Sequence, residues 1–297
     1  MGKRKYKNYN NFLRAFRIWD IYILLYKKLP KYYHYMIKKR YKNLDRFKVN
    51  IFDVSFYISI DDFYSKTWVF IRCDQDIIHE EKATKLMGEK LKNSKCFVDV
   101  GAHLGYFTLF ASKIITKGKI FSFELDKINY NLLKKNIQLN NCKNVEIFNY
   151  AISDKPGEIK YFRSSDQPMP NLDILGIPAD DSESKIISVN SITLDDFFKY
   201  QVEKPDIVKI DVEGAEMIVL KGMKKIIKDY KPMLFIEIHP NVLPKFESSV
   251  KDVFTFLKKN EYKIYEFTDM RNIWKDRFLK ELDNYTNINK NTMFFAC

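Results

Sequence analysis

The sequence predicts an α/β fold in which a mostly parallel sheet is covered by helices on both faces. Three observations support this prediction. Strand-like and helix-like segments alternate after residue 50, a pattern typical of parallel strands joined by crossover helices. Residues 97–109, FVDVGAHLGYFTL, have the pattern of a buried strand, a glycine loop and the start of a helix. Acidic residues stand where several predicted strands end, and such sheets bind ligands at that edge.

The first segments after residue 50 are expected to be two strands and a helix. Residues 54–60 and 68–72 are rich in β-branched and aromatic residues and flank a polar turn, which predicts a pair of strands. Residues 79–92 have the composition of a helix.

From residue 96 strands and helices alternate to the end of the sequence. The predicted strands cover 96–100, 119–125, 145–152, 206–212, 233–238, 262–267 and 292–297, and the predicted helices cover 106–115, 129–140, 216–228 and 250–259. The last two strands have no helix between them, so the final strand is expected to run antiparallel. An irregular insertion separates residues 152 and 206, and its stretch 163–184 has the composition of a mobile loop.

The net charge of +13 comes entirely from residues 1–50. That segment contains 15 Lys and Arg against 2 Asp and Glu, whereas residues 51–297 contain 36 of each kind. Aromatic residues are interleaved with the charges, and residues 12–29 have the spacing of an amphipathic helix. We therefore expect a basic, aromatic extension over 1–50 and a main domain over 51–297.

The chemistry of this extension leaves three interpretations open. A basic, aromatic amphipathic helix suits the surface of an anionic membrane. Basic residues with stacking aromatic rings also suit single-stranded nucleic acid. In the third interpretation the helix simply packs on the main domain, because charge alone identifies no partner.

Composition restricts the class of protein and its compartment. An apolar content of 46% supports a sizeable core and excludes global disorder. The four cysteines form no CxxC pair, which favours a reducing compartment over a disulfide framework or a zinc site. No signal peptide is evident, and the apolar run at 21–26 is far shorter than the ~20 residues of a spanning helix. We expect a cytoplasmic protein, with peripheral membrane contact left open.

The glycine loop and two acidic residues indicate the cofactor. A dinucleotide loop reads GxGxxG and places pyrophosphate at a helix N-terminus, whereas Gly101 and Gly105 follow Asp99 with GxxxG spacing. A carboxylate at that point repels phosphate and attracts an ammonium or sulfonium group. Glu124 ends the next strand, where it could accept both ribose hydroxyls. S-adenosylmethionine, which has a ribose, no phosphate and a local positive charge, fits such a site.

The sequence resembles the FkbM family of S-adenosylmethionine-dependent methyltransferases. The resemblance is carried by VDVGAHLGYFTL (98–109), FELD (123–126), AISDKPG (151–157), DIVKIDVEGAEMIVLKG (206–222) and FIEIHP (235–240). It covers a motif core of 96–240 and implies the Rossmann-like class I fold, with a seven-stranded, mostly parallel sheet. One departure is His103, where the family usually has Asn.

The resemblance also implies roles for individual residues. Those around the methionine part of the cofactor would be Asp99, Gly101, Ala102, His103, Gly105 and Tyr106. Glu124 would bind the ribose, Leu125 would pack on the adenine, and Tyr150 and Ala151 would flank the adenine edge. Asp211 would face the methionine amino group or the acceptor. The implied reaction is methyl transfer, usually to oxygen, on glycans, glycolipids or related small molecules.

The acceptor side of the predicted site contains Asp211, Glu237 and His239. Glu237 and His239 stand two apart at a strand end, so their side chains should point the same way. His239 could be the base that activates a hydroxyl, with Glu237 orienting its ring. It could equally make only a structural hydrogen bond. The three side chains could instead hold a divalent metal, but their spacing is not diagnostic, so no metal is assigned. A carboxylate acceptor would need no base.

Two other functions remain open. An RNA 2′-O-methyltransferase is favoured by the basic N-terminus and would use Lys209, Asp211, Lys221 and Glu237. Lys221 is expected more than two turns into a helix, away from the strand ends, which argues against that set. A non-catalytic protein that binds the cofactor or a partner is the third interpretation, against which the retention of Asp99 and Glu124 argues.

Overall fold

The computed structural model describes residues 30–74, 77–163, 172–174, 185–267, 279–286 and 288–297. Contacts divide the chain into two compact units. The smaller comprises Met1–Asp53 with Tyr57–His79, and the larger comprises Val54–Phe56 with Glu80–Cys297. The amphipathic helix expected at 12–29 and most of the loop expected at 163–184 lie outside the described residues.

The smaller unit is built on two helices. Its elements are α3 (Pro30–Arg40), β1 (Arg46–Ile51), β2 (Val54–Ser59, whose first residues belong to the larger unit) and α4 (Phe63–Arg72). Helix α3 contacts α4 and buries Tyr33 and Ile37. The Arg40 guanidinium donates two hydrogen bonds of 2.9 Å to the Asp74 carboxylate, which ties the end of α3 to the segment after α4.

The prediction of a strand at 68–72 is wrong, because these residues form the second half of α4. A short apolar run does not distinguish a buried strand from a buried helix turn. The deciding residue is Asp62, the N-cap, which accepts hydrogen bonds from Ser65 N at 2.7 Å and Ser65 Oγ at 2.6 Å.

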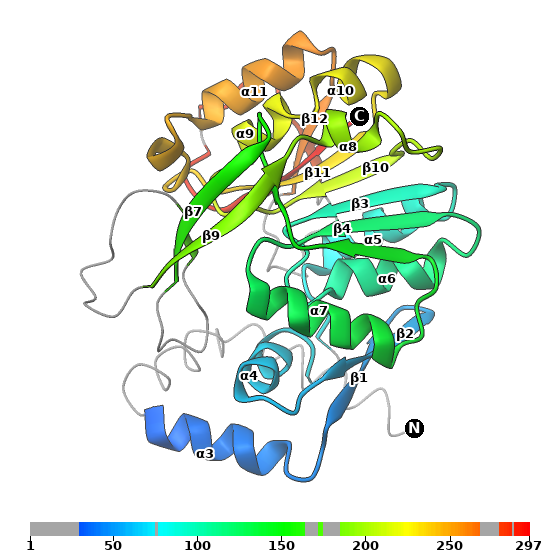
Figure 1. Ribbon diagram of the computed structural model, residues 1–297, viewed down its shortest axis with the longest axis vertical. Helices are drawn as coiled ribbons and strands as arrows, with labels where there is room; N and C mark the ends of the chain where they lie inside the picture. Colours follow the sequence, from blue (N-terminus) through cyan, green and yellow to red (C-terminus); the bar gives the residue numbers. More distant parts are fainter. Residues whose placement is uncertain (1–29, 75–76, 164–171, 175–184, 268–278, 287) are drawn as a thin grey trace. The chain divides into compact units, whose positions relative to one another are not determined.

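The larger unit is a central eight-stranded sheet with helices on both faces (Figure 1). The strand order is β13-β12-β14-β11-β10-β3-β4-β5. The strands are β3 (Cys96–Val100), β4 (Lys119–Phe123), β5 (Val145–Phe148), β10 (Ile207–Ile210), β11 (Met233–Ile238), β12 (Ile264–Phe267), β13 (Leu279–Glu281) and β14 (Thr292–Ala296). Strands β11, β10, β3, β4 and β5 pair in parallel. Strand β14 runs antiparallel to β11 and β12, as predicted.

The predicted helices of the larger unit begin and end close to their expected positions, whereas α8 (Leu194–Phe198) lies in the insertion that was expected to be irregular. The helices of this unit are α5 (Glu81–Leu91), α6 (Tyr106–Ile114), α7 (Lys127–Leu139), α8, α9 (Glu216–Lys221), α10 (Lys224–Tyr230) and α11 (Val250–Lys259), with a 3-10 turn at Leu243–Phe246. The helix expected over 216–228 is interrupted at Gly222, where a Cβ atom would lie 2.0 Å from the carbonyl oxygen of Ser153. The backbone at the helix break therefore packs directly against the turn that follows β6.

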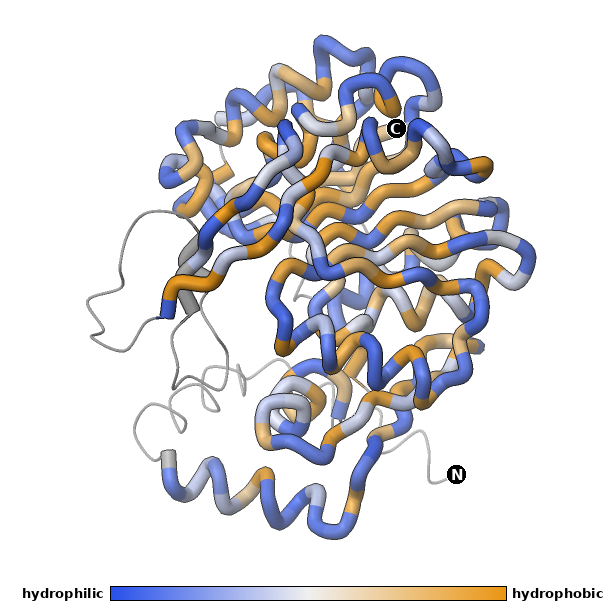
Figure 2. The backbone as a smooth tube through the Cα atoms, in the orientation of Figure 1, coloured by the Kyte–Doolittle hydropathy of each residue, from blue (hydrophilic) through white to orange (hydrophobic). Residues whose placement is uncertain are grey.

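The core lies on both faces of the central sheet. Alternate side chains of the strands, such as Val98 and Val100, Val208 and Ile210, pack with α8–α11 in one buried cluster. The intervening side chains face the other way, where Asp99 and Lys209 meet α6. Figure 2 shows hydrophobic residues concentrated along the central strands.

Two features of the strands differ from the sequence prediction. The central sheet has one strand more than the expected seven, because the short β13 pairs with β12 at the edge. A second sheet, in the order β6-β9-β7-β8, is built largely from the insertion expected to be irregular. Its strands are β6 (Ala151–Ile152), β7 (Gly157–Arg163), β8 (Leu172–Ile174) and β9 (Lys185–Ile192). The strand predicted at 145–152 is thus divided between two sheets.

Asn149 marks the division. Its side-chain amide donates to the carbonyl oxygens of Glu124 and Leu125 at 2.8 Å each. These hydrogen bonds fix the chain beside the end of β4 just where it leaves the central sheet.

Candidate active site

The loop after β3 has a backbone conformation that requires glycine at two points. Gly101 has φ 82° and Gly105 has φ 98°, values that L-residues avoid. A Cβ atom on Gly101 would lie 1.8 Å from the carbonyl oxygen of Asp211. The amides of Gly101 and Ala102 both donate to the carbonyl oxygen of Phe123, at 2.9 and 3.0 Å. The loop is therefore fixed across the ends of β3, β4 and β10.

His103 lies in the same loop with φ 55°. Asn, Asp and His are the residues other than glycine that adopt this left-handed conformation most readily. The substitution of His for the Asn usual in the family therefore preserves the backbone. The amide of His103 donates to Glu124 Oε2 at 2.7 Å, so the loop also holds the carboxylate at the end of β4.

Asp99 is buried beneath this loop, with 1% of its surface exposed. Thr108 of α6 donates to Asp99 Oδ2 at 2.7 Å, and Lys209 occupies the paired position on β10. Burial raises the pKa of Asp99, while the charge of Lys209 opposes that shift. Within the described part of the chain Asp99 Oδ1 is buried and has no hydrogen-bond partner, which is uncommon for a buried carboxylate oxygen.

Glu124 follows β4 at the same edge of the sheet and is 4% exposed. Its carboxylate accepts from the amide of His103 and, at 2.9 Å, from the amide of Asp126. Burial raises the pKa of Glu124 to about 7 against the effect of these two hydrogen bonds. Each carboxylate oxygen keeps a second lone pair, so each could accept a hydrogen bond from a hydroxyl group as well.

The remaining residues expected around the cofactor lie near these two carboxylates. Leu125 is half-buried beside a small cluster formed by Ala151, Tyr161 and Val189. Tyr150 packs against the main core. Tyr106 begins α6 and is buried, with its ring edge-on to those of Phe56 and Phe107. Residues of the inserted sheet thus pack against Leu125, which follows β4 and was expected on the adenine side.

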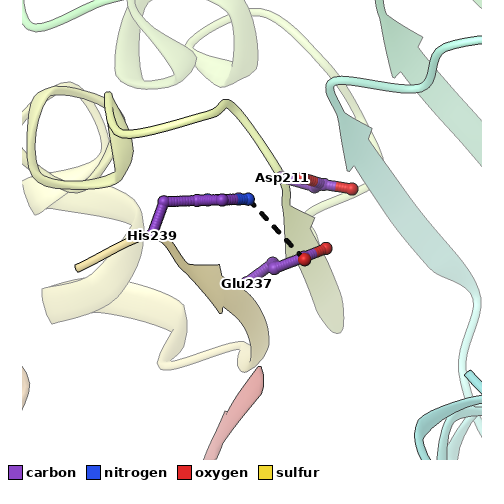
Figure 3. A group of neighbouring side chains, drawn as sticks. All are labelled: Asp211, Glu237 and His239. Carbon is purple, nitrogen blue, oxygen red and sulfur yellow. Dashed lines mark ion pairs between the residues drawn. The ribbon is translucent and has the colours of Figure 1, made fainter. Parts of the chain in front are cut away.

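Asp211, Glu237 and His239 come together at the ends of β10 and β11 (Figure 3). One ligand atom from each lies within 4.8 Å of the others. His239 Nε2 is 3.6 Å from Glu237 Oε1 and 3.6 Å from Glu213 Oε2, which is longer than a hydrogen bond. Lys209, which is buried, contacts Asp211 Oδ2 at 3.1 Å. The sequence therefore identified a cluster that the fold assembles.

The carboxylate hydrogen-bonded to the His239 ring is Glu216, rather than the expected Glu237. Glu216 Oε1 lies 2.7 Å from His239 Nδ1 and also accepts from the amide of Gly214 at 2.9 Å. Glu216 is fully buried at the start of α9. Glu216 belongs to the motif DIVKIDVEGAEMIVLKG (206–222), but its partnership with His239 could not be predicted, because no spacing rule connects α9 to the end of β11.

The charges around His239 determine its protonation. Burial lowers the pKa of His239, but the hydrogen bond to Glu216 and the charges of Glu213, Asp211 and Glu237 raise it to about 9. Burial, together with the charge of Asp211, raises the pKa of Glu237 well above its ordinary value. Without a further cation, these carboxylates therefore favour a protonated ring.

Comparison with models of known protein families identifies the family of this chain. The family model described as "Methyltransferase FkbM domain" matches residues 99–264, more than half of the sequence. This match contains the glycine loop and the cluster at the ends of β10 and β11. The chain belongs to the FkbM methyltransferase family.

Two curated proteins are similar over part of their length. The hexuronic acid methyltransferase AglP of Haloferax volcanii is 27% identical over 172 residues, which cover 58% of this chain and 67% of that protein. The methyltransferase sdnD of Sordaria araneosa is 26% identical over 167 residues, 45% of this chain and 62% of that protein. The chain thus spans about two thirds of each.

Two solved methyltransferase structures are similar to this chain at low identity. The match to an FkbM methyltransferase from Methylobacillus flagellatus covers 69% of this chain and 44% of that protein's chain, with a TM-score of 0.42 and 17% identity. The match to a putative methyltransferase from Streptococcus mutans, solved with S-adenosylhomocysteine, covers 72% of this chain and 97% of that protein's chain. Its TM-score is 0.39 and the identity is 12%.

Proposed function

We propose that the protein transfers a methyl group from S-adenosylmethionine to an oxygen atom of a glycan, glycolipid or related acceptor. The observation that carries the proposal is the pair of buried carboxylates, Asp99 and Glu124, at the ends of neighbouring parallel strands under one glycine loop. When bound, S-adenosylmethionine supplies an electrophilic methyl group on a positively charged sulfur.

The residues present fit this cofactor. The buried Asp99 oxygen that lacks a hydrogen-bond partner among the described residues suits a cationic group. The Glu124 carboxylate, held by two backbone amides, suits the ribose hydroxyls. Ala102, His103, Gly105 and Tyr106 would enclose the methionine part, and Leu125, Tyr150 and Ala151 the adenine.

The acceptor would enter beside Asp211, Glu237 and His239. Because Asp211 contacts Gly101 through its backbone, this cluster borders the cofactor loop, and an acceptor oxygen held there could be aligned with the methyl group. Alignment of the reacting atoms is the main source of catalysis in such a displacement. The relative named hexuronic acid methyltransferase supports an acceptor that contains sugar acids.

The basic segment would bring the protein to an anionic membrane surface where lipid-linked glycans are exposed. In α3 the exposed side chains include those of Lys31, Tyr32, Tyr35, Lys38 and Lys39, so lysines and tyrosines together form much of the exposed part of this helix. An open cavity of about 460 Å³ is lined by Lys31, His34, Tyr35 and Lys38. Such a surface suits phosphate headgroups and their interface. Among the described residues no helix is both long and apolar enough to cross a bilayer.

Mass spectrometry of cell glycans and RNA, with and without this protein, tests the proposal. The expected result is the loss of an O-methyl group from a glycan when the protein is absent, with RNA methylation unchanged. Loss of a methylated nucleotide instead would favour RNA as the acceptor. Lys221, which that function would require, is exposed at the end of α9, whereas Lys209 is buried.

A further inference from the structure

We infer that Asp211, Glu237 and His239 form a binding site for one divalent cation that accepts mixed oxygen and nitrogen ligands. The inference deepens the proposed function, on which the cation's role depends, whereas the binding site itself is independent of methyl transfer. One ligand atom of each residue lies within 4.8 Å of the other two, and Figure 3 shows the three side chains next to one another.

The spacing of the three ligand atoms suits a single ion. Metal–ligand distances of about 2.0–2.2 Å place the ligand atoms of one ion roughly 3–4.4 Å apart. His239 Nε2 and Glu237 Oε1 are 3.6 Å apart, and all three ligand atoms lie within 4.8 Å of one another. The Asp211 and Glu237 side chains are 28% and 16% exposed, so both can rotate slightly onto an ion.

Glu216 provides an independent indication of a metal ligand. A histidine that binds a metal usually donates its second ring N–H to a carboxylate, which fixes the tautomer and directs the other nitrogen at the ion. Here the fully buried Glu216 stands 2.7 Å from Nδ1. That arrangement leaves Nε2 as the ligand atom, and Nε2 is the atom that faces Glu237 and Glu213.

The charge balance also favours a cation. Four carboxylates, those of Asp211, Glu213, Glu216 and Glu237, surround the His239 ring. Lys209 is a buried cation nearby, and its ammonium group forms an ion pair with Asp211 Oδ2 at 3.1 Å. Its charge also faces Asp99 and Glu237. A divalent ion would offset the remaining negative charge without displacing that ion pair.

The cation would complete the acceptor side. A mixed set of two carboxylate oxygens and one imidazole leaves coordination positions open for water or an acceptor hydroxyl. An ion there would lower the pKa of a hydroxyl that reaches it. The same ion could hold the carboxylate of a sugar acid, which matches the acceptor class proposed above.

Manganese binding to the full chain, followed by the electron paramagnetic resonance of free Mn²⁺, tests the site without cofactor or acceptor. We expect the wild-type chain to bind Mn²⁺, and Mg²⁺ to compete with it. Loss of a residue that only supports a ligand costs about 10–100-fold in affinity, so Asp211→Asn and Glu237→Gln should each weaken binding by at least about tenfold. Asp229→Asn, at an exposed aspartate on α10, should bind as the wild type.

The nuclear magnetic resonance signals of the wild-type imidazoles provide a second readout that does not depend on the folding of a variant. The chain has four histidines. Addition of diamagnetic Zn²⁺ should shift the His239 ring signals, assigned by their absence in His239→Gln. The inference is overturned if the wild type leaves Mn²⁺ free, if Asp211→Asn and Glu237→Gln bind it normally, or if Zn²⁺ shifts only another histidine. Failure of methyl transfer with retained binding would overturn the proposed function instead.

Discussion

Gly101 and Asp211 are in direct backbone contact, because a Cβ atom on Gly101 would lie 1.8 Å from the carbonyl oxygen of Asp211. The amide of Asp211 also donates to the carbonyl oxygen of Val100 at 3.0 Å. This contact joins the loop after β3, where we propose that the cofactor binds, to the acidic cluster after β10. Any change at the contact should affect both halves of the site.

Replacement of Gly101 by alanine is expected to destabilise the fold and abolish cofactor binding. Overpacking of a filled site costs about 1–3 kcal/mol, and the positive φ adds roughly 1–2 kcal/mol of strain. Chemical denaturation measures the loss. Gly157→Ala is the control, because Gly157 also has a positive φ but its Cβ would meet only Ser191 Oγ, at 4.0 Å. Equal losses in the two variants would show that the contact with Asp211 is unimportant.

Replacement of Glu124 by alanine should remove the acceptor for the ribose hydroxyls. We expect a loss of about 2–4 kcal/mol in the free energy of S-adenosylmethionine binding, because two hydrogen bonds to a charged group disappear. Isothermal titration calorimetry measures it. Wild-type affinity in this variant would exclude the ribose assignment.

Cofactor affinity should fall as the pH decreases through about 7. Burial raises the pKa of Glu124 to about 7, and the ionised form, present above that pH, is the one that accepts from both hydroxyls. Below it the protonated acid must first lose its proton. Titrations with S-adenosylhomocysteine between pH 5.5 and 8.5 (roughly 1.5 units either side of the expected midpoint) should show the slope. The Glu124→Gln variant should bind S-adenosylhomocysteine weakly, and its affinity should not depend on pH in this range. The same pH dependence in that variant would mean that a group other than Glu124 titrates.

Charge reversal on α3 should release the protein from anionic vesicles. The triple variant Lys31→Glu, Lys38→Glu, Lys39→Glu removes the exposed lysines of that helix, so sedimentation with phosphatidylserine vesicles should decrease while cofactor affinity is retained.

The matched control for this experiment carries the same change in net charge on α10 and α11. It replaces the exposed Lys228, Lys251 and Lys259 by glutamate. An equal decrease in both triple variants would mean that overall charge, rather than the α3 surface, governs vesicle binding.

The sequence was most informative where buried parallel strands end. The runs that form β3, β4, β10 and β11 are apolar and bounded by acidic residues, so both the sheet edge and its functional side chains could be predicted. The contact between Gly101 and Asp211 could not, because it joins residues more than a hundred positions apart. Glu216 escaped notice for the same reason, since its partner His239 comes from another element.

Local ambiguity accounts for the other differences. The run at 68–72 is too short to show a period, and the cap at Asp62 decided the outcome. Strict alternation of polar and apolar residues covers only four positions in each of β7 and β9, 158–161 and 187–190. The small cluster of Ala151, Tyr161 and Val189 that these strands help to form could not be recognised before their pairing was known. The strand through Asn149 was divided by side-chain hydrogen bonds that no pattern of hydrophobicity records.

The most direct test of the account is the transfer of a ¹³C-labelled methyl group from S-adenosylmethionine to defined acceptors by the purified chain. Hexuronic-acid-containing oligosaccharides, neutral oligosaccharides and RNA would be offered in parallel, and the product carbon would be identified by nuclear magnetic resonance. The account predicts a methyl carbon bonded to oxygen on an oligosaccharide, formed together with S-adenosylhomocysteine and absent with Glu124→Ala. A methyl group on RNA or on nitrogen or carbon, or equal transfer by Glu124→Ala, would contradict it.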